Sequence, residues 1–162
     1  MSLLHATPLP VRPDGRQSPT ALSVATGVRR LLAARGCASV TELTLASGRR
    51  ADVIALTPGG DLWIVEVKSS LADFRADAKW RDYRAFCDRF FFAVPPDFSI
   101  GILPEEAGLI LADGFGAHIA REAPEHRLAG ARRKAVTLRF AHAAANRHHA
   151  LCDPQGAAGA LD

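Results

Sequence analysis

The stretch LWIVEVK, residues 62–68, restricts the fold of this chain more than any other segment. Two further runs of strand-forming residues precede it, at 40–45 and 50–56, and only short turn sequences separate the three runs. Links this short predict an antiparallel meander. The third strand ends in Glu66 and Lys68, and a buried strand carries such charges only where something pairs with them. The pattern therefore predicts a sheet with a polar site at the end of its third strand.

The segments around this meander predict an α/β domain. An apolar stripe of helical spacing precedes it at 20–35, and a second helix is expected over 69–89. The apolar run FFFAVP, residues 90–95, is expected to form a parallel strand, because a strand–helix–strand unit crosses over. A hairpin over 108–123 and a basic helix over 130–149 complete the order. The predicted fold is an αβββαβ core with a mixed sheet flanked by helices, extended by this hairpin and helix.

Length and composition are those of one globular domain of 162 residues, 48% hydrophobic and 23% charged. We expect residues 1–19 to be a flexible arm, 20–149 the folded domain and 150–162 a disordered tail. The chain has no apolar run near the ~18 residues of a membrane span, so no membrane partner is expected. Three widely spaced cysteines form no disulfide framework, which predicts a cytoplasmic setting.

Two carboxylates are expected to face each other at the end of the third strand. Pairing through the turn between the second and third strands places Asp52 opposite Glu66, with Lys68 just beyond. Directly opposite side chains in an antiparallel pair lie ~5 Å apart, so two carboxylates there would repel. A divalent cation such as Mg²⁺ or Mn²⁺ removes that repulsion, and hard oxygen ligands suit it. The alternative is a structural role, with both acids ion-paired to Arg50, Lys68 or Arg81.

Positive charge is concentrated towards the C-terminus. The whole chain has a net charge of +3, to which residues 1–125 contribute −1 and residues 126–162 contribute +4. This asymmetry indicates an anionic partner such as DNA, and the alternative is a solvated basic helix. In the second predicted helix, two further cations lie four positions apart on one face. The candidate phosphate contacts are Arg50, Arg75, Lys79, Arg132, Arg133 and Lys134.

The spacing of the site residues resembles that of the PD-(D/E)xK nuclease superfamily. Asp52 is followed fourteen positions later by Glu66-Val67-Lys68, and the predicted core is similar to the restriction-endonuclease-like αβββαβ fold. The segments KSSLADFRADAKWRDY and CDRFFFAVP more closely resemble the MmcB-like DNA repair proteins, over about residues 20–122. The resemblance implies a nuclease-like fold, a role in DNA repair and a divalent-metal site at Asp52, Glu66 and Val67. It also implies that Lys68 is the catalytic lysine.

The chain departs from the superfamily pattern at two places. Ala51 stands where the motif has proline, and residues 20–35 contain no Asp or Glu, although many members carry an acid on this helix. Glu42 in the first strand is the candidate substitute. Our first hypothesis is a Mg²⁺- or Mn²⁺-dependent deoxyribonuclease of DNA repair. The alternative is a module that docks DNA or other repair proteins without catalysis.

Overall fold

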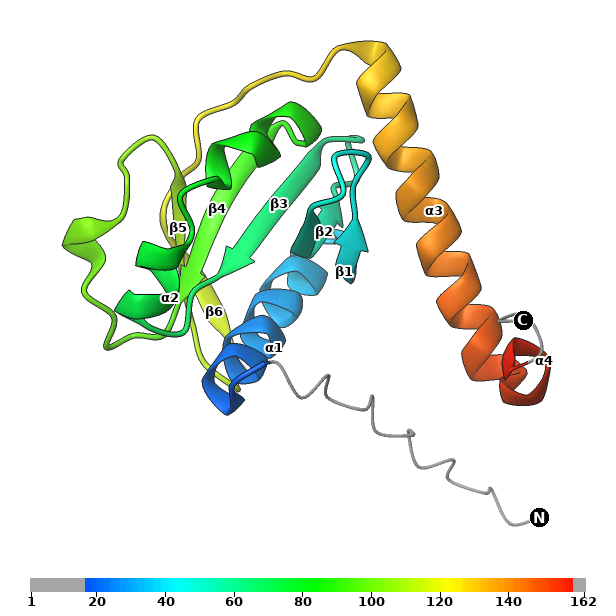
Figure 1. Cartoon of the computed structure of the whole chain (residues 1–162), viewed down its shortest axis with the longest axis horizontal. Helices are drawn as coiled ribbons and strands as arrows, with labels where there is room; N and C mark the ends of the chain where they lie inside the picture. The colour runs from blue at the N-terminus through cyan, green and yellow to red at the C-terminus, as the bar shows by residue number, and fades with distance from the viewer. Residues whose placement is uncertain (1–16, 159–162) are drawn as a thin grey trace.

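The computed structural model describes residues 17–158, which form a six-stranded mixed sheet flanked by helices (Figure 1). The strands lie in the order in which they occur in the chain. They are β1 (Ala38–Thr44), β2 (Arg50–Leu56), β3 (Leu62–Val67), β4 (Arg89–Val94), β5 (Gly108–Ala112) and β6 (Ala117–Arg121).

The direction of each strand follows from the length of its connection. β1, β2 and β3 are antiparallel neighbours joined by tight turns. β4 lies parallel to β3, and β5 lies parallel to β4. β6 returns antiparallel to β5. The α/β class and the restriction-endonuclease-like αβββαβ core that the sequence predicted are confirmed, including the parallel β4 and the added hairpin.

Helix α1 (Pro19–Ala34) covers one face of the sheet. The hydroxyl of Ser18 caps it by accepting a hydrogen bond from the N–H of Ala21 at 3.1 Å. Its buried stripe, which includes Val28 and Leu32, packs with inward-facing strand residues such as Val65. The first helix therefore begins within one residue of the predicted position, and the arm predicted at 1–19 lies almost wholly outside the described residues.

The helix predicted over 69–89 is broken in two, so that prediction was wrong. A short α2 (Leu71–Ala76) is followed by a 3₁₀ helix, η1 (Trp80–Phe86). Residues three apart share one face of a 3₁₀ helix, so Trp80, Tyr83 and Phe86 all turn into the core. Ala76, the last residue of α2, is exposed instead. Aromatic packing has overridden the α-helical spacing that the sequence suggested.

Helix α3 (Gly130–Cys152) and a short α4 (Pro154–Ala158) follow the hairpin, after a connecting segment that the sequence had left unassigned. Within the tail predicted at 150–162, residues 150–152 belong to α3, Asp153 lies between the helices, and α4 follows. A further 3₁₀ turn, η2 (Ile100–Ile102), lies between β4 and β5. Across residues 17–158, none of the helices is both long enough and apolar enough to span a bilayer.

A buried ion pair joins α3 to the sheet at the end where β3 and β4 begin. The carboxylate of Asp88 is inaccessible to solvent and accepts hydrogen bonds from the N–H groups of Leu62 and Leu128, at 2.8 and 2.9 Å. Both terminal nitrogens of Arg133 also donate to it, at 2.7 and 2.6 Å. A bidentate pair with this many partners fixes the position of the helix. Arg133, expected on DNA, is thus engaged inside the protein.

Replacing Arg133 with Ala is expected to lower the free energy of unfolding by about 3 kcal/mol, because the buried carboxylate of Asp88 would lose its counter-charge. Arg132→Ala is the matched control, since Arg132 is exposed and lies over the ring of Phe86. Chemical denaturation measures both variants. Equal losses in the two variants would show that the Asp88–Arg133 pair does not hold α3.

Candidate metal and DNA site

Asp52 and Glu66 meet where the β2–β3 ladder ends. The last paired residues are Val53 and Val65, so the next position in the register brings Asp52 opposite Glu66, as the sequence predicted. Beyond this point, side-chain carboxylates accept the hydrogen bonds between the two strands in place of main-chain carbonyls. The N–H of Asp52 donates to Oε1 of Glu66 at 3.1 Å, and the N–H of Val67 donates to Oδ2 of Asp52 at 2.8 Å. The two carboxylates therefore lie in the gap where the strands separate, at the carboxyl end of β3.

Burial makes both carboxylates unusually basic. Glu66 is 4% exposed, and burial, followed by the nearby charge of Asp52, raises its pKa well above the ordinary value. Burial raises the pKa of Asp52 to about 6, and the hydrogen bond from Val67 offsets only part of this effect. A pair of carboxylates that is costly to ionise together is a site that a divalent cation would stabilise.

Lys68 lies next to this pair but makes its ion pair with another residue. Its side chain is almost fully buried, and Nζ lies 2.8 Å from Oδ2 of Asp77. Burial alone would lower the pKa of Lys68, but the hydrogen bond and charge of Asp77 raise it above the ordinary lysine value. The ammonium therefore stays charged. A paired ammonium can donate to a phosphate, but it is poorly suited to remove a proton from water.

Glu42, the predicted substitute acid, lies on the same row of the sheet as Asp52. The pairs Thr41–Val53 and Leu43–Ala51 lie on either side of these two residues. Glu42 has a φ of 51°, a left-handed conformation that non-glycine residues rarely adopt. Its charge raises the pKa of Asp52. Its own carboxylate forms an ion pair with Arg50 and accepts a hydrogen bond from Gln17, so Glu42 is close to the pair but is held by other partners.

The donor atoms at the gap fit a hard divalent cation. Asp52 and Glu66 supply carboxylate oxygens. The N–H of Val67 points towards β2, and a strand residue directs its carbonyl to the same side as its N–H, so the carbonyl of Val67 faces the gap too. Mg²⁺ or Mn²⁺ commonly takes few protein oxygens and keeps waters. Within residues 17–158, no three His, Cys, Asp or Glu side chains gather as a ready-made metal site, so two carboxylates and one carbonyl are the available set.

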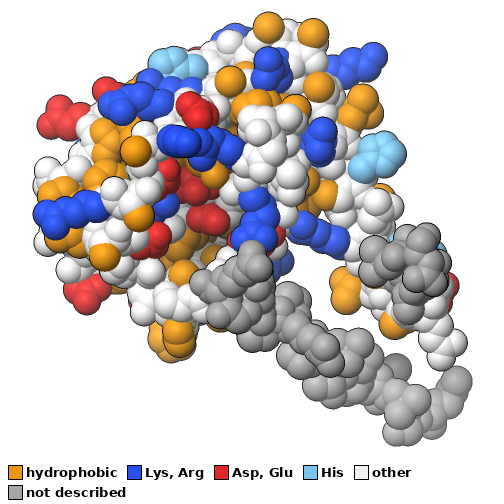
Figure 2. Space-filling model, viewed as in Figure 1, with side chains coloured by type: hydrophobic (Ala, Val, Ile, Leu, Met, Phe, Trp, Pro, Cys, Tyr) orange, Lys and Arg blue, Asp and Glu red, His pale blue; other side chains and the backbone are white. Residues whose placement is uncertain are grey.

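The predicted phosphate contacts fall into two groups at opposite ends of the sheet. Arg75 and Lys79 are exposed on the segment that also carries Asp77, the partner of Lys68. Arg50 lies two residues from Asp52. Arg133 is bound to Asp88 at the other end of β3, and its neighbours Arg132 and Lys134 lie there with it. In Figure 2, acidic side chains gather in the middle of the visible face, with Lys and Arg side chains around them.

Within residues 17–158, the three cations named for the ion-pair alternative each form an ion pair with an acid other than Asp52 and Glu66. Arg50 pairs with Glu42, Arg81 with Glu106 and Lys68 with Asp77. Sequence reasoning did not identify Asp77 as the partner of Lys68. Tyr83 lies in the core, and its hydroxyl donates to the carbonyl of Arg50 at 3.0 Å. It thereby supports the strand that carries Asp52.

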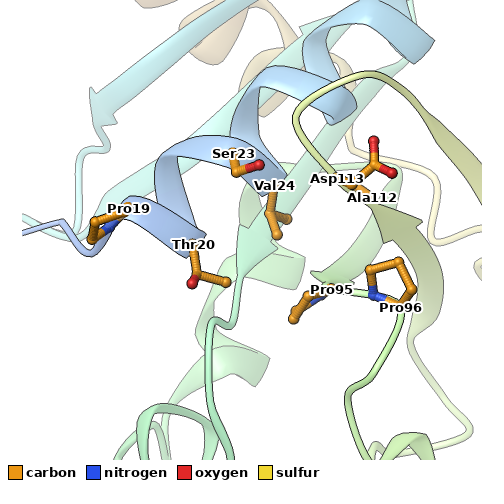
Figure 3. Close-up of a pocket in the computed structure, with 8 residues that line it drawn as sticks. All are labelled: Pro19, Thr20, Ser23, Val24, Pro95, Pro96, Ala112 and Asp113. Atoms are coloured by element: carbon orange, nitrogen blue, oxygen red, sulfur yellow. The ribbon is translucent and has the colours of Figure 1, made fainter.

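A separate cavity of about 320 Å³ lies between the start of α1 and the residues that follow β4 (Figure 3). Thr20, Ser23 and Val24 line one side of it, and Pro95 and Pro96 line the other. Among the described residues that form its wall, none belongs to the carboxylate pair or its lysine. We assign it no part in the chemistry.

Asp52→Asn is expected to gain stability relative to the wild type as the pH rises. The folded-state pKa of Asp52, about 6, exceeds the unfolded value of 3.8, so the folded wild type binds the extra proton. Wild-type stability therefore falls as pH rises from about 4 to 7, by about 3 kcal/mol from this group. The amide oxygen of Asn can still accept the Val67 hydrogen bond. Urea unfolding of both proteins at pH 4 and pH 8 measures the difference, and a pH-independent difference would contradict it.

Comparison with known proteins identifies a matching family and a similar solved structure. A family model described as DNA repair protein MmcB-like matches residues 9–155. The SPO1766 protein of unknown function from Silicibacter pomeroyi has a solved structure that is 49% identical in sequence, with a TM-score of 0.83. The alignment covers 87% of this chain and 96% of that one. No curated protein matches the chain.

Proposed function

The chain belongs to the family of MmcB-like DNA repair proteins, and from that premise we propose that it is a Mg²⁺- or Mn²⁺-dependent deoxyribonuclease. DNA is the partner that a DNA repair family suggests. The proposed reaction is hydrolysis of a phosphodiester bond at the carboxyl end of β3, by Asp52, Glu66 and Lys68.

The observation that carries the proposal is the placement of two buried carboxylates in one gap between strands. Each accepts a main-chain N–H, and burial raises the pKa of both. A fold gains nothing in stability from bringing two such acids together. Together with the carbonyl of Val67, they supply the oxygen ligands that a hard cation needs.

Each of these residues would have a separate role in the hydrolysis. Asp52, Glu66 and Val67 would hold the cation, which when bound supplies Lewis-acid activation of water and neutralisation of phosphate charge. Lys68 would donate hydrogen bonds to a phosphate oxygen, where negative charge builds up in the transition state. Arg75 and Lys79 would bind the neighbouring phosphates of the strand. Glu42 keeps a further negative charge close to Asp52.

Removing the cations beside the site is expected to weaken the dependence of DNA binding on salt. Each lost phosphate contact flattens the slope of log affinity against log salt by about 0.9 on duplex DNA, so Arg75→Ala/Lys79→Ala should flatten it by about 1.8. Arg132→Ala/Lys134→Ala makes the same charge change at the far end of the sheet and should leave the slope unchanged. Fluorescence anisotropy in Ca²⁺ measures both. A larger change in the second variant would place DNA on α3 instead.

A second function, docking of DNA or a repair protein without cleavage, is favoured by two observations. Lys68 is already neutralised by Asp77, and α1 carries no acid within Pro19–Ala34. With the charge of Lys68 neutralised by Asp77, the folded site can be stable without a metal ion. The two functions differ in whether a cation binds at the carboxylates.

Calorimetric titration with Mn²⁺ tests the proposal at its first step. One ion is expected to bind per chain, with release of protons at pH 6, because both carboxylates must ionise. Asp52→Asn should lose this binding while Asp82→Asn, which alters an exposed acid paired with Arg49, should keep it. Binding of equal strength to all three proteins would place the ion elsewhere and favour the docking function.

A further inference from the structure

The buried position of Lys68 requires a partner, and Asp77 supplies it. The Lys68 residue is 6% exposed, and an ammonium in such a place is costly unless it is paired and hydrogen-bonded. The side chain of Asp77 is itself only 16% exposed, so water screens this pair weakly. The 2.8 Å contact between them is therefore a strong constraint on where the lysine can point.

Asp77 is held from both sides by the break between α2 and η1. Its main-chain N–H donates to the carbonyl of Phe74, and its Oδ1 accepts the N–H of Lys79 at 3.2 Å. The other carboxylate oxygen, Oδ2, is then directed at Lys68. The backbone leaves the helical conformation at Asp77, with φ −98° and ψ 82°. The interruption of the helix thus brings this carboxylate to the lysine.

Resting on the proposed nuclease function, we infer that Asp77 is a positioning residue that acts through Lys68. It holds the ammonium of Lys68 beside Asp52 and Glu66. There the ammonium can donate a hydrogen bond to a phosphate bound by the cation at those two acids. An ammonium has three donors, and Asp77 takes one of them. Lys68 can therefore keep this contact and still donate to a phosphate oxygen. The substrate would not have to break the pair.

The first test is a double-mutant cycle on the rate of single-turnover DNA cleavage in Mn²⁺. Asp77→Ala should lower the rate about 10- to 100-fold, with DNA affinity in Ca²⁺ changed less than about twofold. In a Lys68→Ala background the same change should lower the rate no further, because the ammonium that Asp77 positions is absent. Asp77→Asn keeps an oxygen acceptor and should recover part of the loss. Asp82→Ala, on the same segment, should cleave like the wild type.

The second test reads the position of the lysine without cleavage. The chain has three lysines, Lys68, Lys79 and Lys134, and mass spectrometry after acylation reports the labelling of each. Lys68 should label far more slowly than Lys79 in the wild type and should approach it in Asp77→Ala. Unchanged labelling of Lys68 in the folded variant would overturn the inference, because Asp77 would then not be what holds the side chain.

The outcomes separate the inference from the function on which it rests. A wild type that cleaves no DNA overturns the proposed function. A wild type that cleaves, with Asp77→Ala equally fast, overturns the role of Asp77 alone. Equal rate losses from Asp77→Ala with and without Lys68 would also overturn it, since Asp77 would then act by a route other than the lysine.

Discussion

Asp52→Asn and Glu66→Gln are each expected to abolish metal-dependent DNA cleavage while the protein stays folded. Each amide keeps the acceptor oxygen for the main-chain N–H that the acid now binds, so local geometry has its partners. Each change removes a charge that the proposed cation needs. Because the two acids repel each other, neither variant should be less stable than the wild type at pH 8. Cleavage in Mn²⁺ and chemical denaturation, measured on the same preparations, check the loss of activity and the retained stability.

Asp82→Asn is the control for these two variants, since it replaces an exposed acid that pairs with Arg49. It should retain wild-type cleavage. If Asp52→Asn or Glu66→Gln cut DNA at the wild-type rate, the carboxylate pair would not be the reaction centre. If both variants unfolded at a much lower denaturant concentration than the wild type, the carboxylate pair would be structural despite its raised pKa values.

Lys68→Ala is expected to lower the cleavage rate about 100- to 1,000-fold while DNA affinity changes little. An interaction made mainly in the transition state lowers the rate and spares ground-state binding. Lys68→Arg should not restore the rate. A planar guanidinium is larger than an ammonium and would have to share the buried space beside Asp77. The measurement is single-turnover cleavage at saturating enzyme, with affinity measured in Ca²⁺.

The opposite pattern would change the role of Lys68. If Lys68→Ala weakened DNA binding in proportion to the rate, and Lys68→Arg restored both, the lysine would only neutralise a phosphate in the ground state. That result would leave the carboxylate pair as the proposed metal site and remove the transition-state role of the lysine.

The meeting of Asp52 and Glu66 could be predicted from the sequence because a tight turn fixes strand register. Counting outward from the turn between β2 and β3 gives the pairing that the structure contains. The parallel placement of β4 followed from the helical crossover in the same way. Local rules of this kind need no knowledge of distant contacts, and this is why they held.

The partners of the charged residues could not be predicted, because those partners are distant in the chain. Arg133 belongs to a basic run typical of a DNA contact, yet Asp88, 45 positions earlier, binds it inside the fold. The pairing of Lys68 with Asp77 required a break in the second helix. That break comes from Trp80, Tyr83 and Phe86 packing onto β4 residues, a tertiary effect that helical periodicity does not reveal.

Incubation of the wild type with nicked, flapped, single-stranded and duplex DNA, in Mn²⁺ and separately in Ca²⁺, tests the central claim most directly. We expect cleavage of at least one of these substrates in Mn²⁺, none in Ca²⁺, and none by Asp52→Asn purified in parallel. Failure of the wild type to cut any of the four in Mn²⁺, or equal cutting by Asp52→Asn, would contradict the nuclease function and leave docking as the role of this fold.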